Sequence, residues 1–210
     1  MKKGMFKGIF ISIEGTDGSG KTTQINLVKD YLEEKGHNVV ITREPGGTRI
    51  SEKIRSIILD PENKEMCKTT EMLLYASSRA QLIYEVIKPA LKTGKIVICD
   101  RFIDSSFAYQ GYGREIRLDY ITGVNNVALD GVMPDLTFFF DLSPETALSR
   151  RLASSGADRI EREDIEFHMK VYQGYKRLAR LHPERIKMIN AERSVEEIFN
   201  DVKKWLDRLL

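Results

Sequence analysis

The stretch EGTDGSGKTT, from Glu14 to Thr23, constrains the fold more than any other part of the chain. It contains the spacing G-x-x-x-x-G-K-[ST], in which a glycine-rich loop turns its backbone N–H groups toward phosphate. The apolar run Ile9–Ile13 precedes the loop, and the residues after it repeat at helical spacing. A strand, a loop and a helix in this order predict a phosphate site at the positive end of the helix.

Short apolar runs alternate with helical patterns along the whole chain. The runs are rich in β-branched or aromatic residues and do not alternate with polar ones, which is typical of strands buried on both faces. They are Ile9–Ile13, Val39–Thr42, Ile96–Cys99, Leu136–Phe140 and Ile186–Ile189. This order predicts an α/β sandwich around a parallel sheet. Gly36 is expected to end the first helix, and Pro89 to kink or end a later one.

Composition narrows the classes of protein. At 210 residues, with 41% hydrophobic and 30% charged residues, the chain is predicted to form one domain over residues 1–210. Its 33 Lys and Arg and 31 Asp and Glu leave a net charge of +2, which gives no reason to expect a nucleic-acid or membrane partner. The N-terminal apolar run is too short to span a membrane and lacks a signal cleavage site. The widely separated Cys67 and Cys99 are predicted to be free thiols of a cytoplasmic protein.

The loop residues have separate expected roles. The glycines let the backbone turn tightly, Lys21 is expected to reach the outer phosphates, and the Thr22 hydroxyl to bind Mg²⁺. The predicted ATP-binding set is Gly15, Thr16, Asp17, Gly18, Ser19, Gly20, Lys21, Thr22 and Thr23. The loop alone is compatible with a GTPase switch, a motor ATPase or a small-molecule kinase. A guanine-reading Asn/Thr-Lys-x-Asp motif is absent and a motor would need a larger chain, whereas a kinase needs only a second site and a cover.

Candidates for a second site follow two other predicted strands. Asp100 could hold a metal-bound water or orient Arg101, which can bridge two phosphates as a bidentate clamp. Arg43 falls at the end of the second run, before a tight loop that begins at Pro45. Tyr75 and Arg79 are four residues apart on a predicted helix and could stack on a base and bond its edge. In isolation such a pair is more often core packing beside a surface charge.

A candidate cover lies in ALSRRLASSGADRIERED, residues 147–164. The helical pattern breaks at Ser154, Ser155 and Gly156 and then restarts. Arg150, Arg151 and Arg159 flank the break. The pattern predicts a lid at about residues 150–160 whose arginines close over ATP. The alternative is a solvated, charged helix face.

Together, EGTDGSGKTT, TREPGGT, LLYASSR, DRFIDSSFAYQGYGR and ADRIERE resemble bacterial-type thymidylate kinases. The resemblance covers nearly the whole chain in order; the longest motif is the most specific and the phosphate loop the least. It implies a P-loop NTPase three-layer sandwich with a five-stranded parallel sheet and a small lid, usually a homodimer. The implied reaction transfers the γ-phosphoryl group of ATP-Mg²⁺ to dTMP, giving dTDP and ADP.

The resemblance also implies residue roles. Asp17 would bond the 3′-hydroxyl of the deoxyribose, and Arg43 and Arg101 would hold the 5′-phosphate of dTMP. Tyr75 would stack on thymine, and Arg79 would read a carbonyl on its edge. The remaining residues of the implied acceptor pocket are Pro45, Ser105, Ser106, Tyr109 and Gln110, with the Tyr109 ring crowding a 2′-hydroxyl.

The catalytic set implied is Lys21, Arg101 and a lid arginine, with Thr22 and Asp100 at the metal. Eukaryotic-type members carry an arginine within the loop, whereas bacterial-type members place it on the lid. Gly18 follows Asp17 here, so the lid must supply it, and Arg151 and Arg159 are the candidates. The chain departs from its relatives at Ser154 and Ser155, where further arginines are common, and at Tyr75, where phenylalanine is common. Two rivals remain: a kinase for another acceptor such as dUMP, CMP or a deoxynucleoside, and a nucleotide-dependent binding switch.

Overall fold

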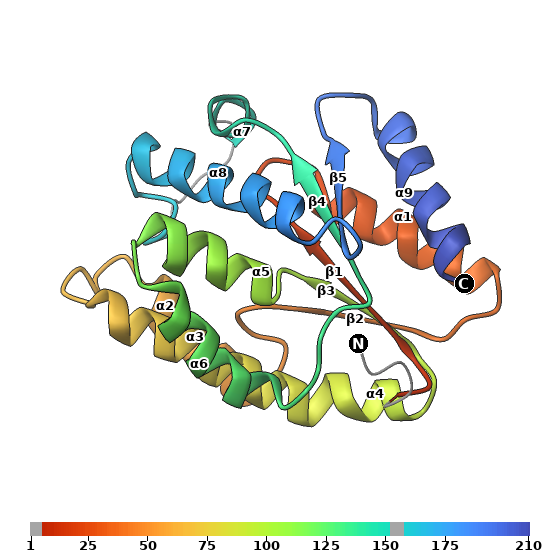
Figure 1. Cartoon of the computed structure of the whole chain (residues 1–210), viewed down its shortest axis with the longest axis horizontal. Coiled ribbons are helices and arrows are strands. Elements are labelled where there is room, and N and C mark those ends of the chain that lie inside the picture. The colour runs from red at the N-terminus through yellow and green to blue at the C-terminus, as the bar shows by residue number, and fades with distance from the viewer. Residues whose placement is uncertain (1–5, 152–157) are drawn as a thin grey trace.

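The computed structural model describes residues 6–151 and 158–210, which form a parallel sheet with helices on both faces (Figure 1). The strands are β1 (Ile9–Glu14), β2 (Val39–Arg43), β3 (Ile96–Asp100), β4 (Leu136–Asp141) and β5 (Ile186–Asn190). The helices are α1 (Lys21–Glu34), α2 (Arg49–Leu59), α3 (Lys68–Leu82), α4 (Lys88–Lys92), α5 (Ile103–Ser106), α6 (Leu118–Leu129), α7 (Pro144–Arg151), α8 (Ile165–Leu181) and α9 (Val195–Leu209), with π-helical segments η1 (Ile83–Ile87) and η2 (Phe107–Gly113). The apolar runs therefore predicted the strands correctly.

The strand order is β2-β3-β1-β4-β5, with every neighbouring pair parallel. Asp100 at the end of β3 stands beside Ile13 of β1 on one side and beside Arg43 of β2 on the other. Because the carboxyl ends of these strands meet at one edge, the loops that follow them converge there. This edge carries the site described below.

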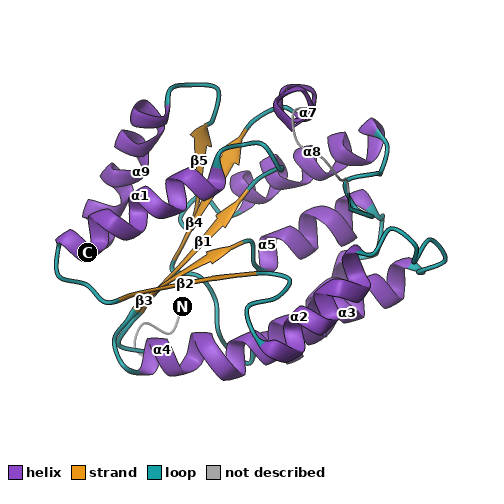
Figure 2. Ribbon diagram, turned by 180° about the vertical axis from the view of Figure 1, so that it is seen from behind, coloured by secondary structure: helices purple, strands orange, loops and turns teal. Residues whose placement is uncertain are grey.

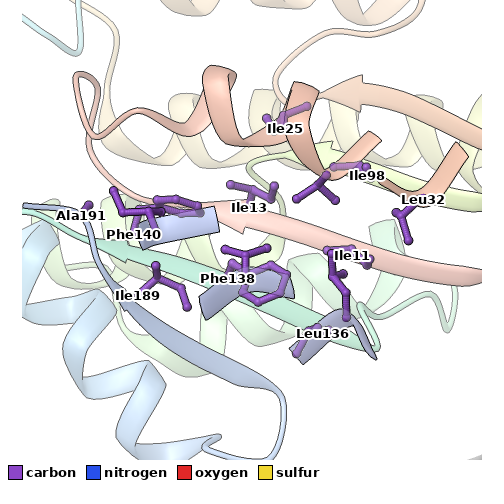
Figure 3. Close-up of a cluster of buried hydrophobic side chains, with 14 of the residues drawn as sticks. Ile11, Ile13, Ile25, Leu32, Ile98, Leu136, Phe138, Phe140, Ile189 and Ala191 are labelled. Carbon is purple, nitrogen blue, oxygen red and sulfur yellow. The ribbon is translucent and has the colours of Figure 1, made fainter. Parts of the chain in front are cut away.

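The core lies on both faces of the sheet, as the unbroken apolar runs predict. On one face, Ile11 and Ile13 of β1 pack with Phe138 of β4 beneath α1 and α9 (Figure 3). On the other face, Phe10 packs against Leu82 and the segment that follows it. Successive residues of β1 thus serve opposite layers, which fixes the register of the strand that leads into the phosphate loop.

The helices divide into two groups around the sheet. Figure 2 shows α1 and α9 together on one side and α2 and α3 on the other, and Figure 1 shows α6 beside α3. The helix α8 packs on η2. None of the helices within residues 6–151 and 158–210 is both long and apolar enough to cross a membrane.

Of the two predicted helix breakers, Gly36 ends α1 as expected, whereas the helical run continues past Pro89 to Lys92. Gly36 follows α1 with φ 86°, and its N–H donates to Glu33 O at 2.9 Å. Pro89 lies in the first turn of α4, directly after the π-helical segment η1. Proline has no N–H for an α-helical bond, so the change of helical type falls immediately before it.

Candidate active site at the carboxyl edge of the sheet

The phosphate loop runs from Gly15 to Gly20 between β1 and α1. Gly18 has φ 85°, and a Cβ there would come within 2.8 Å of Ala147 O, so this position requires glycine. Gly20 precedes α1 without a side-chain cap, which leaves the N–H groups of the first turn open to a ligand. The hydroxyls of Thr16 and Ser19 are buried with no hydrogen-bond partner in the described chain. These unsatisfied donors fit a bound anion.

Lys21 lies across the loop. Its Nζ donates to Gly15 O at 3.0 Å and Thr16 O at 2.8 Å, and lies 3.5 Å from Asp17 Oδ1. Burial, followed by the positive charge of Arg101, lowers the pKa of Lys21, while nearby carboxylates partly offset this. The ammonium group is therefore held among the carbonyls of the loop that it is expected to serve.

Thr22 and Asp100 line one cavity between α1 and the loop after β2. Asp100 Oδ1 is buried without a hydrogen-bond partner, so this carboxylate has a free site for a ligand. Among the described residues, no group of three His, Cys, Asp or Glu side chains could hold a metal by itself. A hydroxyl and a carboxylate, completed by phosphate oxygens and water, suit Mg²⁺, which prefers oxygen ligands and keeps part of its hydration shell.

A second cavity of about 180 Å³ opens beside the loop. It brings together most of the predicted acceptor residues: Asp17, Arg43, Pro45, Tyr75, Arg79, Arg101, Ser105, Tyr109 and Gln110. Ser106 does not line it but accepts a hydrogen bond from Arg79 at 2.9 Å. The cavity also has walls that the sequence did not suggest, namely Glu44, Arg55, Leu59, Asp158, Ile160 and Glu161.

Arg101 stands between the loop and this cavity. Its φ of 66° is unusual for a residue other than glycine, and its N–H donates to Ile13 O at 2.8 Å. Nη2 bonds Asp17 Oδ1 at 2.9 Å, and Nη1 donates to the Tyr175 hydroxyl at 3.3 Å. The guanidinium also lies over the Tyr109 ring, 5.3 Å from its centroid. Four elements thus fix one cation at the junction of the two sites.

Arg79 is buried, with 1% of its surface exposed. Its Nε and Nη2 bond the carboxylate of Glu44 at 2.5 to 3.0 Å, and Nη2 also donates to Phe102 O at 3.1 Å. Nη1 bonds Ser106 and Asn125. The five N–H groups of the guanidinium are therefore all occupied. Arg79 reaches the cavity wall, and a base carbonyl there would have to share one of these donors.

Arg43 is less constrained. Its side chain is 46% exposed, bonds Glu52 at 3.0 Å and reaches Pro45 O at 3.3 Å. Since a surface ion pair of this kind contributes little, Arg43 can exchange Glu52 for another anion at small cost.

The two lid candidates differ. Arg159 is anchored away from the phosphate loop: Nη2 bonds Glu71 Oε2 at 2.7 Å and Nε donates to Ile58 O at 2.8 Å. Arg151 ends α7, while Ser154 and Ser155, at the predicted break, lie outside the described residues. The structure thus brings Lys21 and Arg101 together and leaves Arg159 on the α3 side of the acceptor cavity.

Three polar residues of this region were not among the site residues that the sequence predicted. Glu71 on α3 binds Arg114, Arg159 and Gln110, and so joins the lid segment to the acceptor cavity. Tyr175 on α8 bonds Arg101. Helix patterns carry no sign of such long-range contacts. Glu14 did give a signal, because it is an acidic residue at the end of an otherwise apolar strand.

A phosphate-binding loop, an adjoining cavity and a fixed arginine between them define a P-loop phosphotransferase that acts on a small phosphorylated acceptor. A sequence model of the family described as thymidylate kinase matches residues 13–202. The chain is 51% identical to a thymidylate kinase of Exiguobacterium sp. strain AT1b over 96% of each chain. It is 48% identical to one of Clostridium novyi, over 96% of this chain and all of that one.

A crystal structure of thymidylate kinase from Ehrlichia chaffeensis superposes with a TM-score of 0.78 at 37% identity, over 95% of this chain and 98% of that one. The chain therefore belongs to the thymidylate kinase family, whose members phosphorylate dTMP to dTDP with ATP. The expected fold is confirmed by the same comparison.

The Glu71 cluster yields a stability prediction. Glu71→Gln should lower the free energy of unfolding at pH 7 by about 3 kcal/mol, because Arg159 loses its ion pair with Glu71 and Arg114 keeps only its pair with Glu163. Burial raises the pKa of Glu71, but bonds and charges from Arg114, Gln110 and Arg159 outweigh burial and hold this pKa below its usual range. The contribution is thus complete above the unfolded-state pKa and disappears as the pH falls through the lower folded-state pKa.

Urea unfolding at a series of pH values measures this effect. The difference between the wild type and Glu71→Gln should narrow in acid. Glu166→Gln, at an exposed position of α8, should change stability by less than about 0.5 kcal/mol throughout. A deficit of Glu71→Gln that stays constant down to strong acid would contradict the role of the ionised carboxylate.

Proposed function

We propose that this chain phosphorylates dTMP with the γ-phosphoryl group of ATP, with the acceptor in the cavity lined by Tyr75 and Arg101. The observation that carries the proposal is the position of Arg101, bonded to Asp17 of the phosphate loop while it lines the acceptor cavity. An arginine at that junction can contact both the acceptor's phosphate and the group in transfer.

The reaction asks for positioning and charge neutralisation. The acceptor phosphate is already a nucleophile at neutral pH, so no general base is needed. Lys21 and Arg101 neutralise charge that develops on the transferred group, in a site where their geometry is set in advance. Thr22 and Asp100 would hold Mg²⁺, which would supply positive charge that neutralises the phosphates of ATP. The backbone N–H groups of Gly15 to Thr23 hold the remaining phosphate oxygens.

The acceptor roles follow the geometry of the cavity. Arg43 is free to exchange Glu52 for the 5′-phosphate, which Arg101 holds from the other side. Tyr75 provides a ring for stacking on thymine. The Tyr109 ring lies against Arg101, next to the place where a sugar would follow the phosphate, and disfavours a 2′-hydroxyl.

Asp17 and Arg79 complete the acceptor proposal. Asp17 accepts a hydrogen bond from the 3′-hydroxyl of the deoxyribose. Arg79 donates a shared hydrogen bond from one of its N–H groups to a thymine carbonyl. Pro45, Ser105, Ser106 and Gln110 shape the wall behind them. A cytoplasmic location belongs to the same proposal and rests on the resemblance alone.

The lid supplies the last positive charge. Residues around 150–160 close over ATP, and either Arg151 or Arg159 approaches the transferred group. Arg159 would first exchange its bond to Glu71, whereas Arg151 already lies on α7, whose Ala147 adjoins the loop.

A homodimer is proposed through the α2, α3 and α6 side. These adjacent elements and η1 expose large apolar side chains: Ile50, Ile57, Leu73, Tyr84, Tyr120 and Val127. Val127 is 83% exposed. Apolar surface of this extent on neighbouring helices favours association with a second copy.

An acceptor panel tests the function. ADP release from ATP-Mg²⁺ should be rapid with dTMP, slower with dUMP, and close to zero with AMP and GMP, because the proposed stacking on Tyr75 and bond from Arg79 select thymine. UMP, CMP, dCMP and thymidine complete the panel. A preference for another acceptor would overturn the roles of Tyr75 and Arg79, and no acceptor at all would favour a nucleotide-dependent switch.

Two substitutions test the chemistry. Lys21→Ala and Arg101→Ala should each lower kcat at least about 100-fold, because each removes a fixed charge from the transferred group. Unfolding free energies should stay near that of the wild type. Lys29→Ala and Arg117→Ala, which remove exposed charges, should keep normal turnover. Near-normal turnover in Arg101→Ala would remove this residue from the mechanism.

Sedimentation tests the dimer. The wild type should sediment at about twice the 24.1 kDa of one chain, and Val127→Asp should shift it toward the monomer because a carboxylate would be buried. Met188→Asp, at an exposed position of β5, should leave the mass unchanged. A monomeric wild type at high concentration would refute the dimer.

A further inference from the structure

Glu14 is a carboxylic acid without access to water, directly beneath the acceptor site. It is the last residue of β1 and none of its surface is exposed. Its Oε1 accepts the N–H of Phe102 at 2.8 Å. Its Oε2 is 2.6 Å from Ser105 Oγ and 3.0 Å from the Tyr175 hydroxyl. The proposed chemistry gives this residue no role.

Glu14 Oε2, Ser105 Oγ and the Tyr175 hydroxyl oxygen form a closed triangle. The third side joins Ser105 Oγ to the Tyr175 hydroxyl at 2.7 Å. Three contacts of hydrogen-bond length need three protons, because two oxygens this close repel each other without one. Ser105 and Tyr175 supply one each. A proton on the Glu14 carboxyl would complete the set, so the geometry favours a neutral acid.

The surroundings favour the same state. Burial, and next the charge of Asp104, raise the pKa of Glu14 to about 8. The hydrogen bond from Ser105, the charge of Arg101 and the hydrogen bond from Phe102 lower this pKa but do not outweigh burial. Asp104 is itself paired with Arg185 at 2.5 Å, so burial dominates. The other titratable groups that act on Glu14, or on which it acts, come from the surrounding elements: Lys21 of α1, Cys99 of β3, Tyr109 of η2, Tyr175 of α8 and Arg185 before β5.

The triangle is joined to Arg101 by a single contact. Arg101 Nη1 donates to the Tyr175 hydroxyl, whose own proton is directed into the triangle. Tyr175 therefore accepts from the arginine on one side and donates toward Glu14 on the other. No charge from Glu14 reaches Arg101 as long as the acid stays neutral, so the full positive charge of the guanidinium faces the cavity.

We propose that Glu14 is a positioning residue that must be neutral to hold Arg101, through Tyr175 and Ser105, in the orientation that binds the acceptor's phosphate. The inference rests on the proposed function of Arg101 and extends it to the residue behind it. Ionised Glu14 leaves the Ser105–Tyr175 contact without a proton and attracts the guanidinium away from the cavity. Loss of one proton thus opens the triangle and weakens acceptor binding.

The consequence is a specific dependence on pH. Once Glu14 ionises, above a pH of about 8, KM for dTMP should rise about tenfold for each further pH unit. KM for ATP should not rise in the same way, because the hydrogen-bond partners of Glu14 are Phe102, Ser105 and Tyr175, which lie outside the phosphate loop. The acceptor phosphate loses its second proton near pH 6, and this changes the acidic part of the pH profile of KM for dTMP equally in every variant.

The test is the pH profile of KM for dTMP in the wild type and in Glu14→Gln. An amide keeps one acceptor and supplies donors, so it imitates the neutral acid and cannot ionise. Glu14→Gln should match the wild type at pH 7 within about threefold and lose the alkaline rise in KM. Glu197→Gln, which changes an exposed carboxylate in the first turn of α9, should keep the alkaline rise in KM for dTMP. An unchanged alkaline rise in Glu14→Gln would overturn the proposal and point to another group, such as Lys21.

A second measurement does not depend on turnover. Infrared difference spectra of the wild type between pH 7 and 10 should show a protonated carboxyl band that disappears on titration and is missing from Glu14→Gln. The absence of such a band at pH 7 would also overturn the proposal. The failures are distinguishable: an acceptor panel without a preference for dTMP would refute the proposed function, whereas an ionised Glu14 beside an essential Arg101 would refute this inference alone.

Discussion

The exclusion of water from charged groups governs this site. A buried charge without a partner costs several kcal/mol, so each charged group that the fold encloses must be met by another group at hydrogen-bond distance. Glu44 meets Arg79, and Glu71 meets Arg114. These pairs join segments that are far apart in the sequence, and they turn the loops at the carboxyl edge of the sheet into a rigid wall around the acceptor cavity.

Fixed geometry of this kind has a direct value for phosphoryl transfer. The protein contributes little covalent chemistry, so the rate depends on how well cations are placed before the substrates arrive. Arg101 illustrates the point: an ion pair, a hydroxyl, an aromatic ring and a left-handed backbone all act on it at once. Arg43 is the opposite case, an exposed side chain that can follow the ligand.

Much of this arrangement could be read from the sequence because it depends on local patterns. The buried strands follow from unbroken apolar runs, and the phosphate loop from the spacing of its glycines and lysine. The convergence of Arg43 and Asp100 follows from the rule that ligands gather at the carboxyl ends of parallel strands. The family motifs extended this to Tyr75, which does line the cavity.

The remainder depends on partners that only tertiary structure supplies. Nothing near Arg79 in the sequence indicates that Glu44 and Asn125 occupy its donors, and nothing near Arg159 indicates that Glu71 holds it. Tyr175 lies 161 positions from Glu14, which it bonds. Spacing rules describe one helix or one strand, so contacts of this length are outside their reach.

The close approach of Ala147 to Gly18 bears on how this family could diversify. The family resemblance of the sequence implies an arginine within the loop of eukaryotic-type relatives and on the lid of the bacterial type. At position 18 a Cβ would collide with a backbone oxygen, and the φ of 85° resists any L-residue. A single codon change there would damage the loop before the new cation could act. In this chain, a residue with a side chain at position 18 would require a shift of α7, so a loop arginine could not be added to the present structure by substitution alone.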